Sequence, residues 1–71
     1  MINMILVESS NLYAIDYDDT DRILIIQFHD GRIYEYYNVP RIIYEELYSA
    51  PSKGKYHHEY IKNNYEYRRI K

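Results

Sequence analysis

The chain has 71 residues, a net charge of −2 and no cysteine, so it is one small domain (residues 1–71) that neither disulfides nor thiolate zinc sites can stabilise. Its hydrophobic content of 46% argues against disorder, and its apolar runs are far shorter than the roughly 20 residues of a membrane span. Because no basic and apolar leader opens the chain, we expect cytoplasmic residence. Eleven tyrosines, one Phe and no Trp suit half-buried faces, interfaces and ligand pockets.

The charge is divided unevenly along the chain. Residues 1–35 carry seven acidic and two basic side chains, whereas residues 36–71 carry four acidic and seven basic ones. Such a molecule can bind an anion locally at its basic end. It is poorly suited to long nucleic acid, whose binding needs many basic contacts and an attractive overall field.

Residues 1–7 and 12–17 predict two strands on either side of a turn at residues 8–11. An acidic turn follows at residues 18–21. Its aspartates, with Asp16, resemble a calcium loop only superficially, because the central glycine and the distal glutamate are absent. We therefore interpret them as a solvated turn.

Residues 22–28 and 33–37 predict a β-hairpin, for which two registers are open. A two-residue turn pairs Phe28 with Ile33, whereas a three-residue loop with Gly31 in a left-handed bulge pairs Phe28 with Arg32. The bulged register is favoured because it makes one face wholly apolar or aromatic. That face holds Leu24, Ile26, Phe28, Tyr34 and Tyr36.

The opposite face of the same hairpin still carries Ile23, Ile25 and Ile33. Three isoleucines are too many for a solvated face, so a helix or another subunit should cover part of it. Together with the thin core of a short chain, this face predicts a homo-oligomer.

Two short helices and a last strand complete the predicted order. Pro40 suits a first helical position, and Ile43, Leu47 and Ala50 form a core stripe. Ser52 can cap a second helix that runs to about Lys62, with an apolar side of Tyr56, Tyr60 and Ile61. Asn63 and Asn64 end it, and residues 65–70 alternate as a strand. The fold class is α+β, a small antiparallel sheet of about four to five strands packed with two short helices.

No residue pattern indicates catalysis or a bound metal or cofactor. The serines lie in turns or caps, and two glycines cannot build a phosphate-binding loop. His57 and His58 are adjacent, so on a helix they point in different directions, and His29 lies at a hairpin tip. We expect a non-enzymatic protein.

Two basic segments are the candidate ligand sites. At the start of the second helix, Ser52, Lys53, Gly54, Lys55 and Tyr56 offer free N–H groups, two ammonium groups and a close backbone approach. The alternative is a capped helix end with two solvated lysines. In the tail, Tyr65 and Tyr67 can stack on bases while Arg68 and Arg69 bind phosphate. The alternative is a strand whose tyrosines pack inward and whose arginines pair with acidic residues.

Tyr34 and Tyr36 are interpreted first as core or interface residues, opposite Ile26 and Leu24, and second as an aromatic platform. In order and spacing, the motifs of residues 4–70 resemble the KTSC domain family: Val7-x-Ser9-Ser10, Tyr17, Leu24-x-Ile26-x-Phe28, Gly31, Tyr34-x-Tyr36, Val39-Pro40, Leu47, Ser52-x-Gly54-x-Tyr56, Ile61, and Tyr65 with Arg68. Asp16 departs from the family pattern, in which a small residue precedes the tyrosine.

The family is named for its occurrence at the C-terminus of some lysyl-tRNA synthetases, and it also occurs as small bacterial and phage proteins. The resemblance implies RNA binding and supplies no catalytic residues. From charge and motifs together we predict a non-enzymatic module that binds a small nucleotide-type anion, as a sequestering protein would, in a pocket at a subunit interface. RNA or tRNA binding is the alternative, and a protein-interaction or inhibitor module with a host protein as partner is the second alternative.

Overall fold

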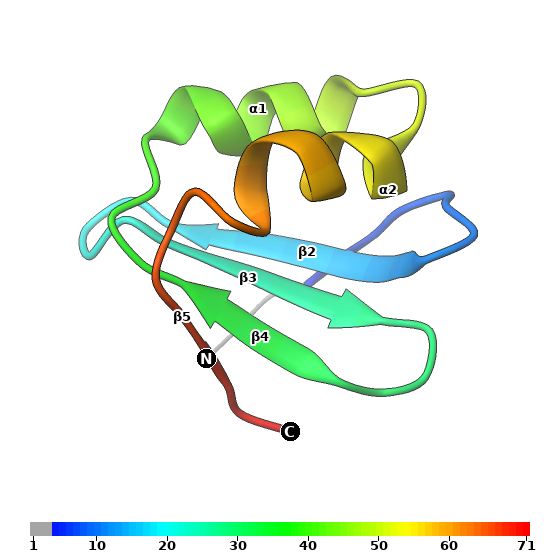
Figure 1. The fold of residues 1–71 in the computed structure, drawn as a ribbon, viewed down its shortest axis with the longest axis horizontal. Coiled ribbons are helices and arrows are strands. Elements are labelled where there is room, and N and C mark those ends of the chain that lie inside the picture. The colour runs from blue at the N-terminus through cyan, green and yellow to red at the C-terminus, as the bar shows by residue number, and fades with distance from the viewer. Residues whose placement is uncertain (1–3) are drawn as a thin grey trace.

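The computed structural model describes residues 4–71 as a five-stranded antiparallel meander with helices on one face (Figure 1). In chain order the elements are β1 (Ile5–Leu6), β2 (Leu12–Asp18), β3 (Ile23–Phe28), β4 (Ile33–Tyr36), α1 (Arg41–Ser49), α2 (Lys53–Tyr56), a π-helical turn η1 (His57–Ile61) and β5 (Tyr67–Arg69). The α+β prediction is confirmed. Of the strand predicted at residues 1–7, the structure shows Ile5–Leu6, and residues 1–3 lie outside the described part of the chain.

The β3–β4 hairpin has the bulged register. Leu24 pairs with Tyr36 and Ile26 with Tyr34, and the Phe28 amide donates to the Arg32 carbonyl at 2.9 Å. Gly31 has a φ of +94°, a conformation that a Cβ would strain. The three-residue loop therefore places Arg32 opposite Phe28, on the face of the sheet that also carries Tyr34 and Tyr36.

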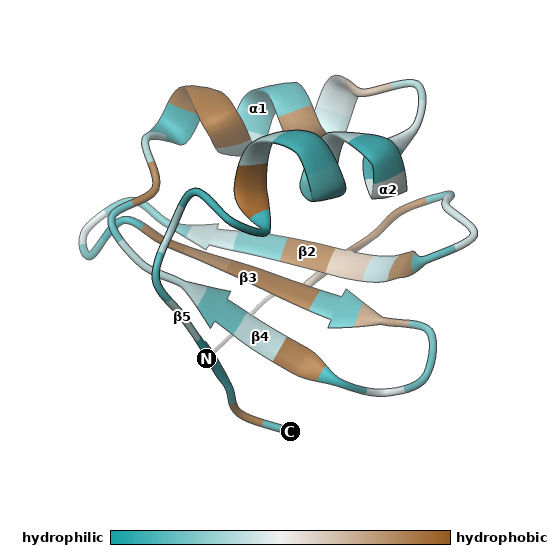
Figure 2. Cartoon of the chain, in the orientation of Figure 1, coloured by the Kyte–Doolittle hydropathy of each residue, from teal (hydrophilic) through white to brown (hydrophobic). Residues whose placement is uncertain are grey.

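The core lies between this face of the sheet and the helices, where the hydropathy colouring is brown on both layers (Figure 2). Seven side chains in it are fully buried: Leu12, Ile15, Leu24, Ile26, Val39, Leu47 and Ile61. Each such side chain stabilises the fold by about 1.5–3 kcal/mol relative to its exposed state. Because the seven come from β2, β3, η1, α1 and the β4–α1 connection, the core joins every layer of the molecule.

The predicted boundaries of the helices agree closely with the structure. Pro40 is the N-cap of α1 rather than its first residue, and Leu47 of the predicted stripe is fully buried. Ser52 caps α2, where its hydroxyl accepts a hydrogen bond from the Lys55 amide. The predicted apolar side of the second helix is wrong in one member, because Tyr60 is 51% exposed.

The inward position of that helix belongs instead to His57, which lies four residues before the buried Ile61. The helix ends where it was predicted to end, since the Asn64 side-chain amide donates to the Tyr60 carbonyl at 2.8 Å. None of the helices in the described residues is long and apolar enough to cross a membrane.

The helices leave the second face of the sheet uncovered (Figure 1). Ile25 is buried on this face, whereas Leu6 is 66% exposed. Ile70 lies beside Ile33 and is 39% exposed. The salt bridge between Arg68 and Glu35 also lies on this face, with 3.7 Å between its atoms. Apolar side chains therefore stay accessible on this face, although they are Leu6 and Ile70 rather than the three isoleucines named from the sequence, of which Ile25 is buried and Ile23 and Ile33 are half-buried.

Candidate functional site

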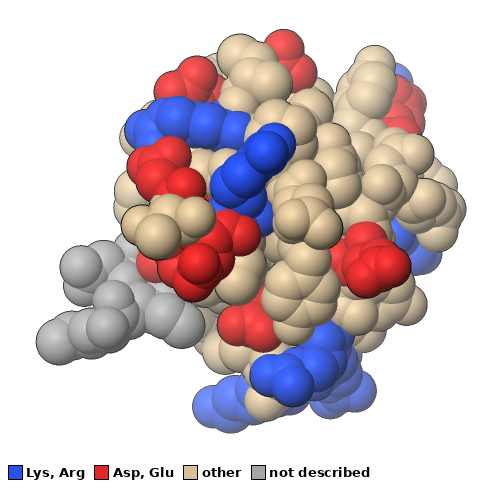
Figure 3. Space-filling view, turned by 90° about the vertical axis from the view of Figure 1, so that its left-hand side faces the viewer, with Lys and Arg blue, Asp and Glu red and all other residues tan. Residues whose placement is uncertain are grey.

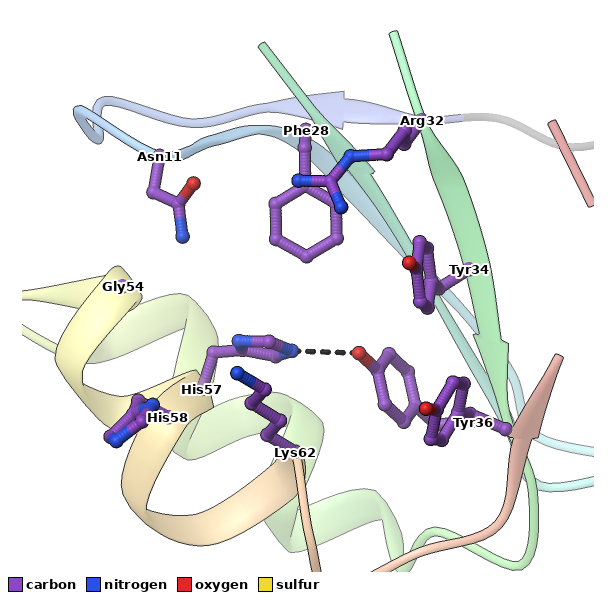
Figure 4. A pocket seen from close by; sticks show the side chains of 10 residues that line it. Asn11, Phe28, Arg32, Tyr34, Tyr36, Gly54, His57, His58 and Lys62 are labelled. Atoms are coloured by element: carbon purple, nitrogen blue, oxygen red, sulfur yellow. Dashed lines mark hydrogen bonds between the residues drawn. The ribbon is translucent and has the colours of Figure 1, made fainter. Parts of the chain in front are cut away.

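A pocket of about 210 Å³ opens between the sheet and the second helix, at the end of the sheet where the β3–β4 turn lies (Figure 4). Phe28, Tyr34, Tyr36, Tyr67 and the backbone of Gly54 form its apolar and aromatic part. Its polar lining consists of Asn11, Arg32, His57, His58 and Lys62. These residues come from both layers of the fold, so the pocket forms only when the helices pack on the sheet.

One wall of the pocket is a set of tyrosine rings from the last two strands. Tyr67 pairs with Tyr36 across the β4–β5 ladder, so its ring lies on the same face as those of Tyr34 and Tyr36. The Tyr67 and Tyr34 rings are stacked with centroids 5.6 Å apart and planes 25° apart. Tyr67 is 55% exposed, so much of this ring is accessible. A ring of this kind can stack on a planar heterocycle.

The floor of the pocket holds a buried hydrogen bond between side chains. The Tyr36 hydroxyl lies 2.7 Å from Nε2 of His57, as the dashed line in Figure 4 marks. Burial, together with the positive charges of Lys62 and His58, lowers the pKa of His57 to about 4. Burial also raises the pKa of Tyr36. Both groups are therefore neutral at pH 7 and form a polar floor without charge.

Arg32 is held in a fixed position at the turn end of the pocket. Its Nε donates to Oδ2 of Asp30 at 2.7 Å, and its backbone amide donates to Oδ1 of the same carboxylate at 3.0 Å. Its guanidinium carbon lies 5.5 Å from the Phe28 ring centroid and 5.9 Å from that of Tyr34. These contacts orient the guanidinium plane before any ligand arrives. The hydrogen bonds also lower the pKa of Asp30 and raise that of Arg32.

The second helix supplies the opposing cation. His58 and Lys62 are four residues apart, so both side chains reach the same side of the helix, and Figure 4 shows the Lys62 ammonium pointing into the pocket. The π-helical turn η1 carries His58, and Lys62 is its C-cap, whose amide donates to the His57 carbonyl at 2.9 Å. Turns of this type recur at functional sites because they shift side chains relative to a regular α-helix.

The lining of the pocket carries two cations, Arg32 and Lys62, although the chain is acidic, and the Asp30 carboxylate that pairs with Arg32 lies beside it. None of its lining residues, all within residues 4–71, carries a carboxylate. The acidic β2–β3 turn lies at the opposite end of the meander, because alternate turns of an antiparallel sheet lie at opposite ends. Figure 3, which views that end, shows several acidic side chains there with Lys and Arg side chains between them. The negative net charge therefore lies mainly away from the pocket.

The structure separates the predicted site residues into two groups. Gly54 and Tyr67 line the pocket together with Tyr34 and Tyr36, the two tyrosines interpreted as core or platform. Tyr36 belongs both to the core and to the pocket, because the residue is 2% exposed while its hydroxyl is hydrogen-bonded to His57 at the pocket floor. The candidates outside this pocket are Ser52, Lys53, Lys55, Tyr56, Tyr65, Arg68 and Arg69.

Several of these outer residues have contacts within the fold. Lys53 donates to the Ala50 carbonyl at 3.1 Å, and the Tyr56 hydroxyl donates to Glu46 at 2.7 Å. The Tyr65 side chain packs against the core. Arg68 pairs with Glu35 on the uncovered face, and Nε of Arg69 donates to the Lys71 carbonyl at 3.0 Å. These contacts fit the capping and structural alternatives for both basic segments.

Six pocket residues were not singled out from the sequence: Asn11, Phe28, Arg32, His57, His58 and Lys62. A signal existed for Arg32, because the bulged register itself puts this residue on the aromatic face. The spacing of His58 and Lys62 was a second signal. Asn11 gave none, since only the packing of the β1–β2 turn beside Gly54 brings it to the pocket, with 3.5 Å between the Asn11 Cβ and a Cβ built on Gly54.

The lining combines aromatic, cationic and uncharged polar side chains. Within residues 4–71 no group of three or more His, Cys, Asp or Glu side chains is arranged to hold a metal ion. The pocket offers aromatic rings for stacking, the cations of Arg32 and Lys62 for an anion, and the polar side chain of Asn11 beside the bonded pair of Tyr36 and His57.

Comparisons with known proteins agree with this fold. The model of the KTSC domain matches residues 8–65. The chain is 43% identical over 63 residues to a lysine–tRNA ligase of a Nostoc species, covering 89% of this chain and 11% of the ligase, so it spans about a tenth of that relative's length. It is 34% identical over 65 residues to a small protein of Stutzerimonas stutzeri, covering 90% of this chain and 92% of that protein.

Among solved structures, the crystal structure of a KTSC domain protein from Yersinia pestis superposes on the whole of both chains with a TM-score of 0.93 at 35% identity. The five-stranded sheet and the helices on its one face are therefore shared with that protein. On the family match, the relatives and this superposition together, the chain belongs to the KTSC domain family.

Proposed function

We propose that this protein is a non-enzymatic, cytoplasmic module that binds a small nucleotide-type anion in the pocket between β4 and the second helix. The observation that carries the proposal is the composition of the lining, in which Arg32 and Lys62 oppose each other beside an aromatic wall and no carboxylate is present. A base can stack on the accessible ring of Tyr67 while the cations bind phosphate.

The negative net charge supports a small ligand over long nucleic acid. Binding to a polynucleotide is driven by the neutralisation of many phosphates along a basic surface. Here the basic pocket is local, and the acidic end of the molecule would repel a long polyanion. A small nucleotide needs only the local field of the pocket.

A thermal-shift assay with nucleotides and with bulk tRNA tests the proposal. A ligand at 100 times its Kd stabilises a protein by about 2.7 kcal/mol, which raises the Tm of a domain this small by roughly 10–20 °C. We expect such a shift with a nucleotide, and we expect Arg32→Gln and Lys62→Gln each to reduce it strongly. A panel in which no nucleotide changes the Tm would refute the proposal.

Matched variants outside the pocket control for the loss of charge. Lys55→Gln and Arg68→Gln each remove one positive charge from residues that do not line the pocket. We expect both to keep the full shift. If they reduce it as much as Lys62→Gln does, the ligand is bound by the basic segments that the sequence singled out instead.

RNA binding is the second candidate, favoured by the lysine–tRNA ligase of which a segment matches this chain. It predicts a steep loss of affinity with salt and an effect of Arg68→Gln across all RNA sequences. An exposed tyrosine surface without any ligand response would instead favour the third class, a protein-interaction module.

A further inference from the structure

The pocket is small for the ligand class assigned to it. Its volume of about 210 Å³ lies below the roughly 300–1,000 Å³ typical of small-molecule sites. One base with one phosphate can use this space, whereas a dinucleotide cannot be enclosed. The size therefore restricts the enclosed part of the ligand to a single nucleotide unit.

Arg32 is prepared for a phosphate with free oxygens. Because Asp30 already accepts from Nε, the two terminal amino groups of the guanidinium are left facing the pocket side of the β3–β4 turn (Figure 4). Two parallel N–H groups match two oxygens of one phosphate. Rings of Phe28 and Tyr34 hold the guanidinium plane, so little side-chain freedom is lost on binding.

Lys62 approaches the same space from the other layer of the fold. An anion between Arg32 and Lys62 therefore meets positive charge from two sides. A phosphate monoester carries about −1.5 to −2 charges at pH 7, so it gains more from two cations than a diester with a single charge does. A monoester also has only one ester branch, which suits a pocket that encloses one unit.

Resting on the proposed function, we propose that the ligand is a nucleotide with a terminal phosphate monoester, which Arg32 binds and for which Asp30 is the positioning residue. Free mononucleotides and the phosphorylated end of an RNA strand share this chemistry. The internal phosphates of an RNA strand and cyclic phosphodiesters do not.

The first experiment compares phosphates on one base. Affinities are measured by calorimetry for each nucleoside, its 5′- and 3′-monophosphates and its 3′,5′-cyclic monophosphate. We expect a monophosphate to bind about tenfold or more tightly than the cyclic form, a difference of about 1.4 kcal/mol. Short RNA strands with and without a terminal phosphate then distinguish the two sources of the monoester. Binding of the phosphorylated strand alone indicates an RNA end, and binding of neither strand indicates a free nucleotide.

The second experiment measures nucleotide affinity in Asp30→Asn. The affinity should rise if Asp30 acts only through its negative charge, and it should fall if Asp30 holds Arg32 in position. Removing a carboxylate beside the pocket strengthens anion binding if only charge matters. If Asp30 positions Arg32, binding weakens, since the amide offers one accepting oxygen for two N–H groups. We expect about fivefold to tenfold weaker binding. A thermal melt without nucleotide checks that the variant is folded.

Asp21→Asn is the matched control, because it removes one charge at the acidic end of the sheet, and we expect unchanged affinity. Equal binding of monophosphate and cyclic nucleotide, or unchanged or tighter binding in Asp30→Asn, overturns this inference. If nucleotide binding in either of these cases is still lost in Lys62→Gln, the proposed function stands even though the preference for a phosphate monoester does not. If no nucleotide of any form binds, both fail.

Discussion

The Tyr36 hydroxyl and Nε2 of His57 lie 2.7 Å apart, and this bond joins the central face of the sheet to the π-helical turn. His57 is 6% exposed and Tyr36 is 2% exposed, so water has little access to this bond. The same bond forms the floor of the pocket. Stability and site geometry are therefore linked at this one contact, and acid and substitution test it separately.

Acid should destabilise the protein through His57. Its pKa is about 4 in the folded state and about 6.5 when unfolded, so between these values the unfolded state binds the extra proton. Stability is then complete above pH 6.5 and falls as the pH drops towards 4, by on the order of 3 kcal/mol. Urea unfolding between pH 7.5 and 4 measures this loss.

The variant His57→Gln isolates that contribution from the carboxylates, which also titrate in acid. It keeps a polar side chain near Tyr36 but has no proton to gain. We expect its stability to fall less steeply between pH 6.5 and 4 than that of the wild type. Parallel curves for the two proteins would show that His57 is not the source.

Removing the Tyr36 hydroxyl should be costly. In Tyr36→Phe the ring still fills the core, but Nε2 of His57 loses its partner in a buried position. A buried polar group left unpaired costs about 1–3 kcal/mol. Urea unfolding at pH 7.5 measures the difference, with Tyr60→Phe as the control because Tyr60 is 51% exposed. The control should change stability by less than about 0.5 kcal/mol; equal effects would contradict the assigned bond.

The two glycines should respond to alanine in opposite directions. Gly31 has a φ of +94°, so Gly31→Ala should destabilise the protein by about 1–2 kcal/mol. Gly54 lies in α2, and a Cβ there would meet the Asn11 Cβ at 3.5 Å, an ordinary contact. Gly54→Ala should therefore raise stability by about 0.5 kcal/mol through helix propensity. Thermal melts of both variants measure the pair, and a Gly31→Ala protein as stable as the wild type contradicts the bulged turn.

The uncovered face of the sheet predicts self-association. Leu6 is 66% exposed and Ile70 is 39% exposed on this face, and a second copy of the chain would cover both. Light scattering at micromolar concentration should give a mass above that of one chain, and Leu6→Lys should lower it. Ile42→Lys, on a residue of α1 that is 54% exposed, should leave the mass unchanged. A monomeric wild type contradicts this prediction.

Much of the fold could be predicted because local signals agree with one another. The bulged register follows from the faces of Phe28, Tyr34 and Tyr36 around Gly31, and the structure has this register. The helix cap at Ser52 and the helix end near Asn64 could also be predicted, because each depends on a hydrogen bond to a residue three or four positions away in the sequence. The buried side of the second helix was harder to predict. Tyr60 and His57 are both able to face the core, and the structure buries His57 and exposes Tyr60.

The pocket was harder to predict because it lies between layers. Its cations come from a turn and from a helix that are 30 residues apart, and neither basic segment singled out contains them. We selected Lys53, Lys55, Arg68 and Arg69 from the sequence because basic residues are closely spaced there along the chain. Arg32 and Lys62 each stand apart from other lysines and arginines in the sequence, and only the packing of the second helix on the sheet brings them together.

The +94° conformation of Gly31 has a consequence for how the chain folds. A hairpin in the competing two-residue register would pair Arg32 with His29 and would turn Arg32, Tyr34 and Tyr36 to the other side of the sheet. Such a misregistered molecule has no pocket, so any occupant of the pocket would bind only the correct alignment. The ligand would then act as a selector of strand alignment, enriching the native register in proportion to its own concentration.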